Sequence, residues 1–186
     1  MVKLNNIYTR TGDGGSAGLV DGSRVSKSSL RMTAIGEVDE ANAAIGVPIA
    51  ALEEGKLRDQ LLRIQNELFD AGADVATPGE VDGALRIVAS QVERLEREID
   101  EMNASLAPLT SFILPSGSTG VSALHLARCV VRRAERAAVA LNEAESLNPQ
   151  LIAYLNRLSD HLFVAARSVA SREGGDVLWQ PGATRT

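Results

Sequence analysis

The N-terminal segment carries the residues of this chain whose types and spacing best suit the binding of an anion. Residues 8–19 read Tyr-Thr-Arg-Thr-Gly-Asp-Gly-Gly-Ser-Ala-Gly-Leu, and Lys27 follows closely. Successive backbone N–H groups in a glycine-rich turn can converge on a phosphate. A helical bundle needs no such loop for its own packing, so the run suggests a nucleotide site. From these residues alone, an ordinary tight turn is an equal alternative.

The loop differs from two common phosphate-binding motifs. No Gly-Lys-Ser or Gly-Lys-Thr follows its glycines, which excludes a P-loop. No strand precedes it and no βαβ unit surrounds it, which excludes a dinucleotide-binding fingerprint. If the loop binds phosphate, it does so outside these two folds.

A second polar cluster lies on a predicted helix near residue 130. Four residues share one face of that helix, namely His125, Arg128, Arg132 and Glu135, and Arg133 and Arg136 add charge nearby. Arginine suits bidentate recognition of phosphate or carboxylate groups. The competing interpretation is a solvated surface stripe.

Two further polar residues lie beside apolar rows on their helices. Asp39 is close to the apolar side of the first predicted helix and is expected to have a cationic partner. Arg128 suits that role, either within the chain or across an oligomer interface. Asn156 flanks the core row of the last helix, where a helix–helix contact and a ligand contact are both open interpretations.

The remaining reactive side chains point to no metal site and no covalent chemistry. Neither His125 nor His161 has a Glu three residues before it, so the Glu-x-x-His signature of di-iron bundles is absent. Cys129 is the only cysteine, so it forms no internal disulfide, and its apolar surroundings predict a small buried side chain. No nucleophile–base pair can be assigned.

Hydrophobic periodicity predicts five helices that carry these groups, so the expected fold is all-α, a five-helix bundle. The predicted helices run from about Ser26–Ser29 to Leu52, Lys56 to Val75, Ile87 to Asn103, Ser118 to Glu145 and Pro149 to Arg172, and Pro48 is expected to kink or end the first. The outer face of the third is dense in Glu and Arg, which predicts a solvated surface. Residues 1–186 form one domain: an extended glycine-rich loop over 1–25, the bundle over 26–172 and a tail over 173–186.

Composition narrows the function classes. A net charge of −5 argues against sequence-independent nucleic-acid binding. No apolar run is long enough to cross a bilayer and no secretory signal is visible, so the expected location is the cytoplasm, with no membrane partner.

Five motifs in order resemble one family, the ATP:cob(I)alamin (corrinoid) adenosyltransferases of the propanediol-utilisation type. They are Tyr-Thr-Arg-Thr-Gly-Asp-x-Gly at 8–15 with Lys27, Gly-Glu-Val-Asp-Glu-x-Asn at 36–42, Phe-Ile-Leu-Pro at 112–115, Ala-Arg-x-x-x-Arg-Arg-Ala-Glu-Arg at 127–136, and Tyr-Leu-Asn-Arg-Leu-Ser-Asp at 154–160. The resemblance covers nearly the whole chain. Each motif alone is weakly specific, whereas five in register are strongly so.

The resemblance implies a homotrimer that transfers the 5′-deoxyadenosyl group of ATP to cob(I)alamin and releases triphosphate. It implies that ATP, with Mg²⁺ held through its phosphates, is bound by Thr9, Arg10, Thr11, Gly12, Asp13, Gly14, Gly15, Ser16, Ala17, Gly18, Lys27, Arg132, Arg133, Glu135, Arg136 and Asn156. Asp39 and Arg128 would form an ion pair between subunits near the reaction centre, where Arg132 also acts. Phe112 would line the cobalamin pocket and exclude a lower axial ligand. A corrinoid reductase and an adenosylcobalamin-dependent acceptor enzyme are implied partners.

Two positions depart from the family pattern. Ala17 stands where the family commonly carries Thr, so one phosphate-facing hydroxyl is lost, and Ser16 is the nearest substitute. Ser116 and Gly117 stand where the family often has two glycines. Neither change removes a charged group, so we expect them to alter affinity more than activity.

Two other function classes are compatible with a helical bundle of this composition. One is a protein that binds ATP as a sensor or delivers adenosylcobalamin to a partner enzyme. The other is a purely structural bundle, which predicts no ATP binding. Adenosyl transfer separates the family prediction from both.

Overall fold

The computed structural model describes residues 7–185 and confirms the all-α prediction. Five helices run side by side, α1 (Leu30–Ala51), α2 (Lys56–Val75), α3 (Ala89–Asn103), α4 (Thr119–Ala144) and α5 (Pro149–Ala170). α1 packs mainly on α4 and α2, whereas α5 packs on α4 and α3. Leucine, isoleucine, valine and alanine side chains from all five helices fill one continuous core.

Side-chain caps fix where three of the helices begin. Ser29, Ser118 and Asn148 each accept a hydrogen bond from a backbone N–H in the first turn that follows. Pro48 does not end the first helix, which was one of the two effects expected of it. α1 continues past Pro48 to Ala51, and the N–H of Leu52 still bonds the Pro48 carbonyl at 2.9 Å.

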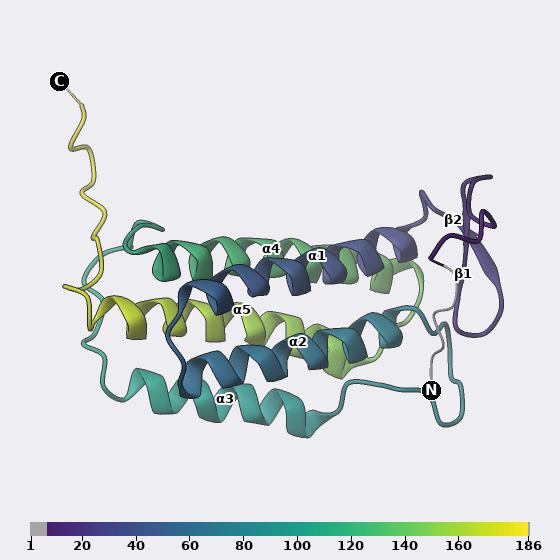
Figure 1. Cartoon of the computed structure of the whole chain (residues 1–186), viewed down its shortest axis with the longest axis horizontal. Helices are drawn as coiled ribbons and strands as arrows, with labels where there is room; N and C mark the ends of the chain where they lie inside the picture. The colour runs from purple at the N-terminus through teal and green to yellow at the C-terminus, as the bar shows by residue number, and fades with distance from the viewer. Residues whose placement is uncertain (1–6, 186) are drawn as a thin grey trace.

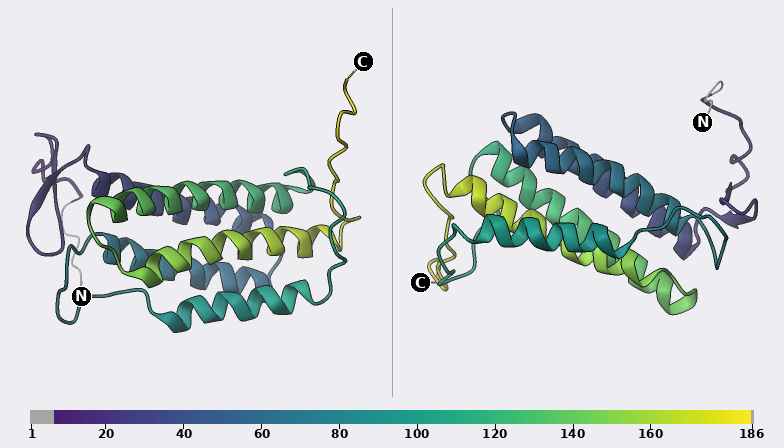
Figure 2. Two further views of the ribbon diagram at one scale, coloured as in Figure 1. Left: turned by 180° about the vertical axis from the view of Figure 1, so that it is seen from behind. Right: turned by 90° about the horizontal axis from the view of Figure 1, so that it is seen from below.

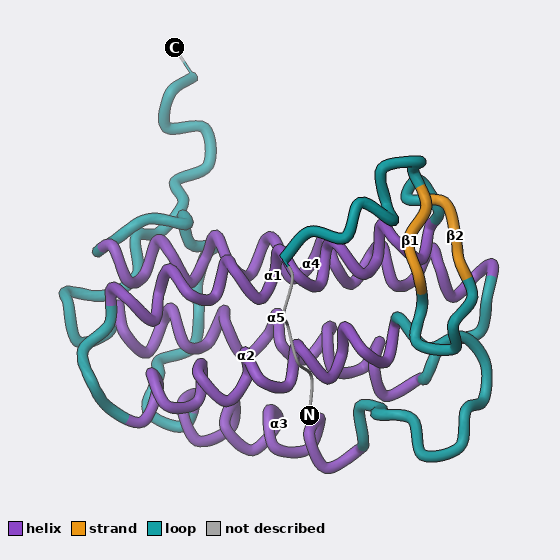
Figure 3. The backbone as a smooth tube through the Cα atoms, turned by 45° about the vertical axis from the view of Figure 1, so that its right-hand side comes forward, coloured by secondary structure: helices purple, strands orange, loops and turns teal. Residues whose placement is uncertain are grey.

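A two-stranded hairpin lies within the segment predicted as an extended loop. β1 (Ser16–Gly18) pairs antiparallel with β2 (Arg24–Ser26), with Ala17 opposite Val25. The Asp21–Gly22 turn closes it, because Gly22 adopts a φ of +82° and the Asp21 carboxylate accepts hydrogen bonds from Ser23. Figure 1 shows the hairpin beyond the end of the bundle where α1 begins, and Figure 3 shows its two strands side by side.

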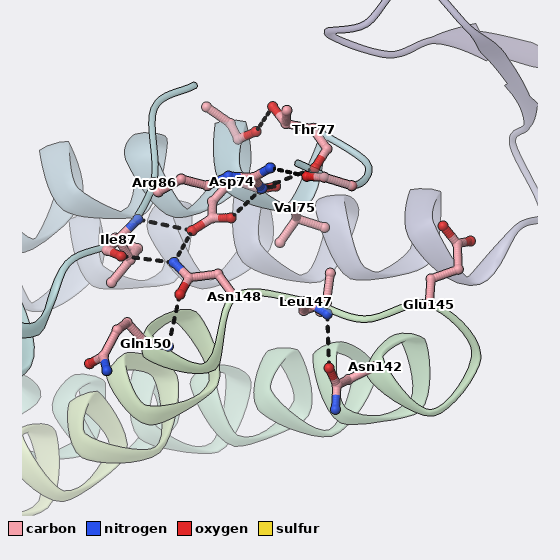
Figure 4. A network of polar contacts seen from close by, with 12 residues as sticks. Asp74, Val75, Thr77, Arg86, Ile87, Asn142, Glu145, Leu147, Asn148 and Gln150 are labelled. Carbon is pink, nitrogen blue, oxygen red and sulfur yellow. Dashed lines mark hydrogen bonds and ion pairs between the residues drawn. The ribbon is translucent and has the colours of Figure 1, made fainter. Parts of the chain in front are cut away.

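The same end of the bundle is held by a buried polar network (Figure 4). Asp74 is fully buried and accepts hydrogen bonds from Arg86 at 2.8 Å, the Ile87 N–H at 2.9 Å and the Asn148 amide at 2.7 Å. These bonds join α2, the loop after it and the start of α5. Because the Ile87 backbone is used in this network, α3 begins at Ala89 rather than at the predicted Ile87.

The hairpin is anchored next to this network. The Val20 N–H bonds the Ala76 carbonyl at 3.1 Å, and buried Arg31 donates to the Val75 carbonyl and to Glu145 at 2.7 Å. The C-terminal end of α2 therefore fixes the glycine-rich segment relative to α1 and α4.

The charged face of α3 is not wholly solvated, contrary to the prediction. Glu98 is buried and bonds His161 at 3.0 Å and Arg63 at 2.6 Å. Glu67 of α2 is also buried and accepts bonds from Arg94 at 2.6 Å and from the Tyr154 hydroxyl at 2.8 Å. Paired in this way, carboxylates can lie between helices at a tolerable desolvation cost.

This network predicts acid sensitivity. Burial alone would raise the pKa of Glu98, but the hydrogen bonds from His161 and Arg63 lower it to about 2, against 4.5 for a free carboxyl. A lowered folded-state pKa adds stability above the unfolded value, and that stability is lost as pH falls from about 4.5 towards 2. We expect urea unfolding to show a loss of about 3 kcal/mol across this range.

The variant that isolates this effect is Glu98→Gln, with exposed Glu93→Gln on the same helix as control. Glu98→Gln should lower stability at pH 7 and flatten the acid limb of the stability profile, whereas Glu93→Gln should preserve both. Equal acid limbs for wild type and Glu98→Gln would contradict the assignment.

The prediction that Cys129 is buried is wrong, because its side chain is exposed. The buried row of α4 passes through Leu124, Ala127 and Val131, and Cys129 lies on a different side of the helix. Within residues 7–185, no helix combines the length and hydrophobicity that a bilayer span requires.

Candidate functional site

The glycine-rich loop is an exposed, tightly turned segment. The Gly15 N–H bonds the Gly12 carbonyl at 3.1 Å, and Gly15 adopts a φ of +79°. Arg10 has a φ of +59°, which is uncommon for a residue with a side chain and stores backbone strain. The hydroxyls of Thr9 and Thr11 lie 2.8 Å apart on this surface.

Two cations from the hairpin flank the loop. The Lys27 N–H bonds the Gly15 carbonyl at 2.9 Å, and a Cβ added at Gly12 would lie 3.0 Å from the Lys27 ammonium. Glycine at position 12 thus permits the close approach of Lys27. Arg24 donates to the Thr11 carbonyl at 2.8 Å and to the Ser16 hydroxyl at 2.9 Å. Sequence reasoning missed Arg24, because the pairing of β1 with β2 was not predicted.

The sequence predicts that the Ser16 hydroxyl takes the place of the threonine hydroxyl that is lost at Ala17. Arg24 engages that hydroxyl through both Nε and Nη2, and Ala17 lies in the strand opposite Val25. Asp13 and Gly14 are exposed in the turn between Gly12 and Gly15, and Gly18 is exposed at the end of β1, opposite Arg24.

The structure brings together two predicted residues on α4 and α5. The Asn156 amide donates to the Glu135 carboxylate at 2.9 Å, which links the two helices at their surface. Arg132 and Arg136 are exposed on the same stretch of α4. These four side chains form a polar patch, here called the α4–α5 patch, with two guanidinium groups available to an anion.

Arg133 is directed elsewhere. Its guanidinium bonds Glu37 at 2.5 Å and also contacts Glu40, both on α1. The paired carboxylates raise the pKa of Arg133 and neutralise its charge locally. Arg133 therefore ties α4 to α1 rather than joining the α4–α5 patch.

Phe112 and Arg128 line one cavity of about 630 Å³ at the opposite end of the bundle. The wall consists of residues from the segment before α4, from α4 and α5 and from the tail: Leu109, Thr110, Ser111, Phe112, Ile113, Arg128, Phe163, Trp179 and Pro181. We call this the Phe112 pocket. The ring of Phe112 lies 6.0 Å from that of Trp179, and Phe112 is 77% exposed, so its ring is free to contact a bound molecule.

Aromatic contacts position Arg128 in this pocket. Its guanidinium lies over the Phe163 ring at 5.8 Å, and the His125 ring contacts the same Phe163 at 6.3 Å. Burial and the charge of Arg128 lower the pKa of His125, so His125 packs as a neutral ring near pH 7. The predicted polar row on α4 thus runs from buried His125 to exposed Arg132.

Asp39 does not pair with Arg128 within the subunit. Asp39 is exposed on α1, and it forms no ion pair with any residue in the described range 7–185. The Nε atom of Arg128 is buried without a hydrogen-bond partner in that same range. The alternative of an ion pair between Asp39 and Arg128 within the chain is therefore not observed in residues 7–185.

The loop and the Phe112 pocket lie far apart in one subunit. Arg31, just after the hairpin, pairs with Glu145 at the C-terminal end of α4, whereas the pocket contains Arg128. Glu145 lies seventeen residue positions after Arg128 along α4 and its C-cap, a rise of roughly 25 Å. Figures 1 and 2 show the hairpin at one end of the bundle and the C-terminal tail at the other.

Comparisons with known proteins identify the family of this chain. The family model described as cobalamin adenosyltransferase matches residues 7–169. A corrinoid adenosyltransferase of Mycobacterium tuberculosis is 49% identical, over 100% of this chain and 98% of its own length. One from Bacillus subtilis is 44% identical, over 95% of this chain and 93% of its own.

The fold comparison gives the same result. A variant of a PduO-type ATP:corrinoid adenosyltransferase from Lactobacillus reuteri, complexed with cobalamin and ATP, superposes with a TM-score of 0.89. It is 35% identical and covers 95% of this chain and 97% of its own. The fold, the ordered motifs and the full-length similarity together show that this chain belongs to the cobalamin adenosyltransferase family.

Proposed function

We propose that this protein transfers the 5′-deoxyadenosyl group of ATP to cob(I)alamin and releases triphosphate, at a site shared between subunits of a homotrimer. The observation that most supports this proposal is that the chain has two different sites. An exposed glycine-rich loop with cations lies at one end of the bundle, and an apolar pocket with Arg128 lies at the other. The first suits a polyphosphate and the second suits a flat apolar macrocycle. Relatives named corrinoid adenosyltransferases support the pairing of these two ligands.

The loop and the α4–α5 patch would bind ATP. Backbone N–H groups of residues 9–18 and the ammonium of Lys27 would hold the triphosphate, with Mg²⁺ bound through the phosphates. Arg132, Glu135, Arg136 and Asn156 would hold the rest of the nucleotide. Arg133 is left out of this proposal because Glu37 and Glu40 occupy its guanidinium.

The chemical demands on the protein match these side chains. The reduced corrinoid supplies the nucleophile, so the protein needs no nucleophile or general base of its own. It must align C5′ of ATP with the corrinoid and stabilise the negative charge that develops on the leaving triphosphate. Lys27 and Arg132 are suited to the second task, and Phe112 is suited to keeping water and a lower ligand from the other face of the corrinoid.

The separation within one subunit supports a shared site. C5′ lies only three phosphate groups from the end of ATP, which cannot span roughly 25 Å. A loop from one subunit beside α4 and α5 of its neighbour would bring the groups together. Such an interface would also bring Asp39 to Arg128, which would give the buried Nε of Arg128 a carboxylate partner.

Subunit mixing tests the shared site. Lys27→Ala impairs the loop and Arg132→Ala impairs the patch, so each homotrimer should be nearly inactive. When the two are unfolded together and reassembled at equal amounts, about one interface in four should join an intact loop to an intact patch. We expect about a quarter of wild-type adenosylation. No recovery above the separate variants would place the whole site within one subunit.

Phe112→Ala tests the pocket half of the proposal. Removal of the exposed ring should allow a ligand to reach the lower face of the corrinoid, which makes cob(II)alamin harder to reduce. We expect a loss of about 100-fold when the reaction starts from cob(II)alamin with a reductant, and a much smaller loss from preformed cob(I)alamin. Equal losses from both starting states would refute the role of Phe112 at the lower face.

The chemistry also implies neighbours in the reaction sequence. A corrinoid reductase must supply the reduced substrate, and an adenosylcobalamin-dependent enzyme must use the product. We propose a cytoplasmic location for all three, where ATP is available.

A further inference from the structure

The Phe112 pocket is built largely from two irregular segments that are far apart in the sequence. The Leu114 N–H bonds the Val177 carbonyl and the Trp179 N–H bonds the Phe112 carbonyl, each at 2.8 Å. Ile113 pairs with Leu178 in an antiparallel bridge, and the Ser111 hydroxyl donates to the Trp179 carbonyl at 2.8 Å. The tail thus forms a short two-stranded unit with the segment that carries Phe112. We call residues 176–181 the strap and residues 107–114 the Phe112 segment.

One buried side chain fastens both parts of this unit to the bundle. Arg167, in the last turn of α5, donates from Nε to Asp176 at 2.9 Å and from Nη2 to the Ala107 carbonyl at 2.8 Å. Asp176 begins the strap, and Ala107 begins the Phe112 segment. The Arg167 side chain is only 9% exposed and that of Asp176 16%, so water does not readily replace these bonds.

Arg167 does not itself line the pocket, but it is close to a residue that does. It lies one helical turn beyond Phe163, which lines the pocket and supports Arg128. No other side chain in residues 7–185 donates hydrogen bonds to both the strap and the Phe112 segment. A planar guanidinium can make both bonds at once, which a single lysine ammonium on a flexible stem does less well.

We propose that Arg167 is a positioning residue that sets the affinity of the Phe112 pocket for the corrinoid, by clamping the strap and the Phe112 segment to the end of α5. The inference depends on the proposed function for the identity of the molecule in the pocket. The clamp itself is a property of the free protein. Its loss should free the paired segments at their base while the five helices stay folded.

The chain offers a built-in reporter, because Trp179 in the strap is its only tryptophan. In Arg167→Gln and in Asp176→Asn, acrylamide should quench Trp179 fluorescence more strongly than in wild type, with no ligand present. Arg172→Gln is the matched control, since Arg172 is an exposed arginine just after α5. It should leave quenching unchanged, and all three variants should keep the wild-type helical circular dichroism.

Steady-state kinetics test the consequence for the reaction. We expect the KM for cob(I)alamin to rise about tenfold in Arg167→Gln and in Asp176→Asn, while the KM for ATP stays within about twofold of wild type. Unchanged quenching with an unchanged KM for cob(I)alamin would overturn the clamp. An equal rise in both KM values would also overturn it, because it would indicate a general loss of structure.

These measurements separate the clamp from the proposed reaction. If wild type forms no adenosylated product, the proposed function fails, whereas the quenching comparison still decides whether Arg167 holds the strap. If Arg167→Gln does not fold, Asp176→Asn decides the matter, because it removes the carboxylate charge that strengthens the bond from Arg167 to the strap and keeps the bond to Ala107.

Discussion

Replacement of Arg132 by alanine should lower kcat/KM for ATP by about 100- to 1,000-fold without loss of folding. Arg132 is exposed on α4, beside the bonded pair Glu135 and Asn156, and its guanidinium is available to an anion. Removal of one preorganised donor to developing negative charge typically costs two to three orders of magnitude in rate. Because the side chain is solvated in the free subunit, its loss should change the free energy of unfolding little.

Two further variants make this result specific. Arg132→Lys keeps the charge but loses the bidentate fork, so we expect an intermediate rate. Arg97→Ala removes an equally exposed arginine on α3 and should keep wild-type turnover. Near-normal turnover in Arg132→Ala, measured by adenosylation at saturating corrinoid, would contradict the role assigned to Arg132.

Replacement of Asp74 by alanine should have the largest effect on stability. Asp74 is fully buried, and its carboxylate bonds Arg86, the Ile87 N–H and Asn148. Removal of one partner from a buried charged network typically costs about 3–5 kcal/mol, because the remaining donors lose their acceptor. That is a large share of the stability of a typical domain. Urea unfolding followed by circular dichroism measures it.

Asp70→Ala on the same helix is the control, since Asp70 is half-buried and makes no ion pair with residues 7–185. It should change stability by less than about 1 kcal/mol. If the free energy of unfolding falls as little in Asp74→Ala as in Asp70→Ala, the buried network contributes little to stability. Because Val20 is bonded to Ala76 nearby, Asp74→Ala should also weaken ATP binding, which calorimetry can measure.

The helices were predictable because local signals agree with the packed structure. Apolar periodicity over residues 56–75 predicts the same bounds that α2 has. The fourth and fifth helices begin within one residue of the predicted starts at Ser118 and Pro149. Such signals depend on neighbours three or four residues away, so one sequence is sufficient to detect them.

Features that depend on distant partners were missed. Arg24 joins the loop only because β1 and β2 pair, and Trp179 lines the Phe112 pocket only because the tail pairs with residues 112–114. Glu98 can be buried because its carboxylate is hydrogen-bonded by His161 and Arg63, which come from two other helices. No local pattern encodes these contacts.

Some of the predicted site residues lie together in the structure, and others do not. The geometry brings Glu135 to Asn156, Lys27 to Gly12 and Phe112 to the pocket of Arg128. It directs Arg133 towards α1, which helical spacing alone did not reveal. The predicted site residues that lie far apart in one chain are the ones that we propose to meet at a site shared between subunits.

Formation of adenosylcobalamin is the most direct test of the account. The protein is mixed anaerobically with ATP, Mg²⁺ and cob(I)alamin, and the absorption spectrum is followed before and after exposure to light. We predict a light-sensitive adenosylated product, with one triphosphate released for each product formed, and no reaction without the protein. ATP binding without any such product would contradict the proposed function and would favour a protein that only senses ATP or carries the coenzyme.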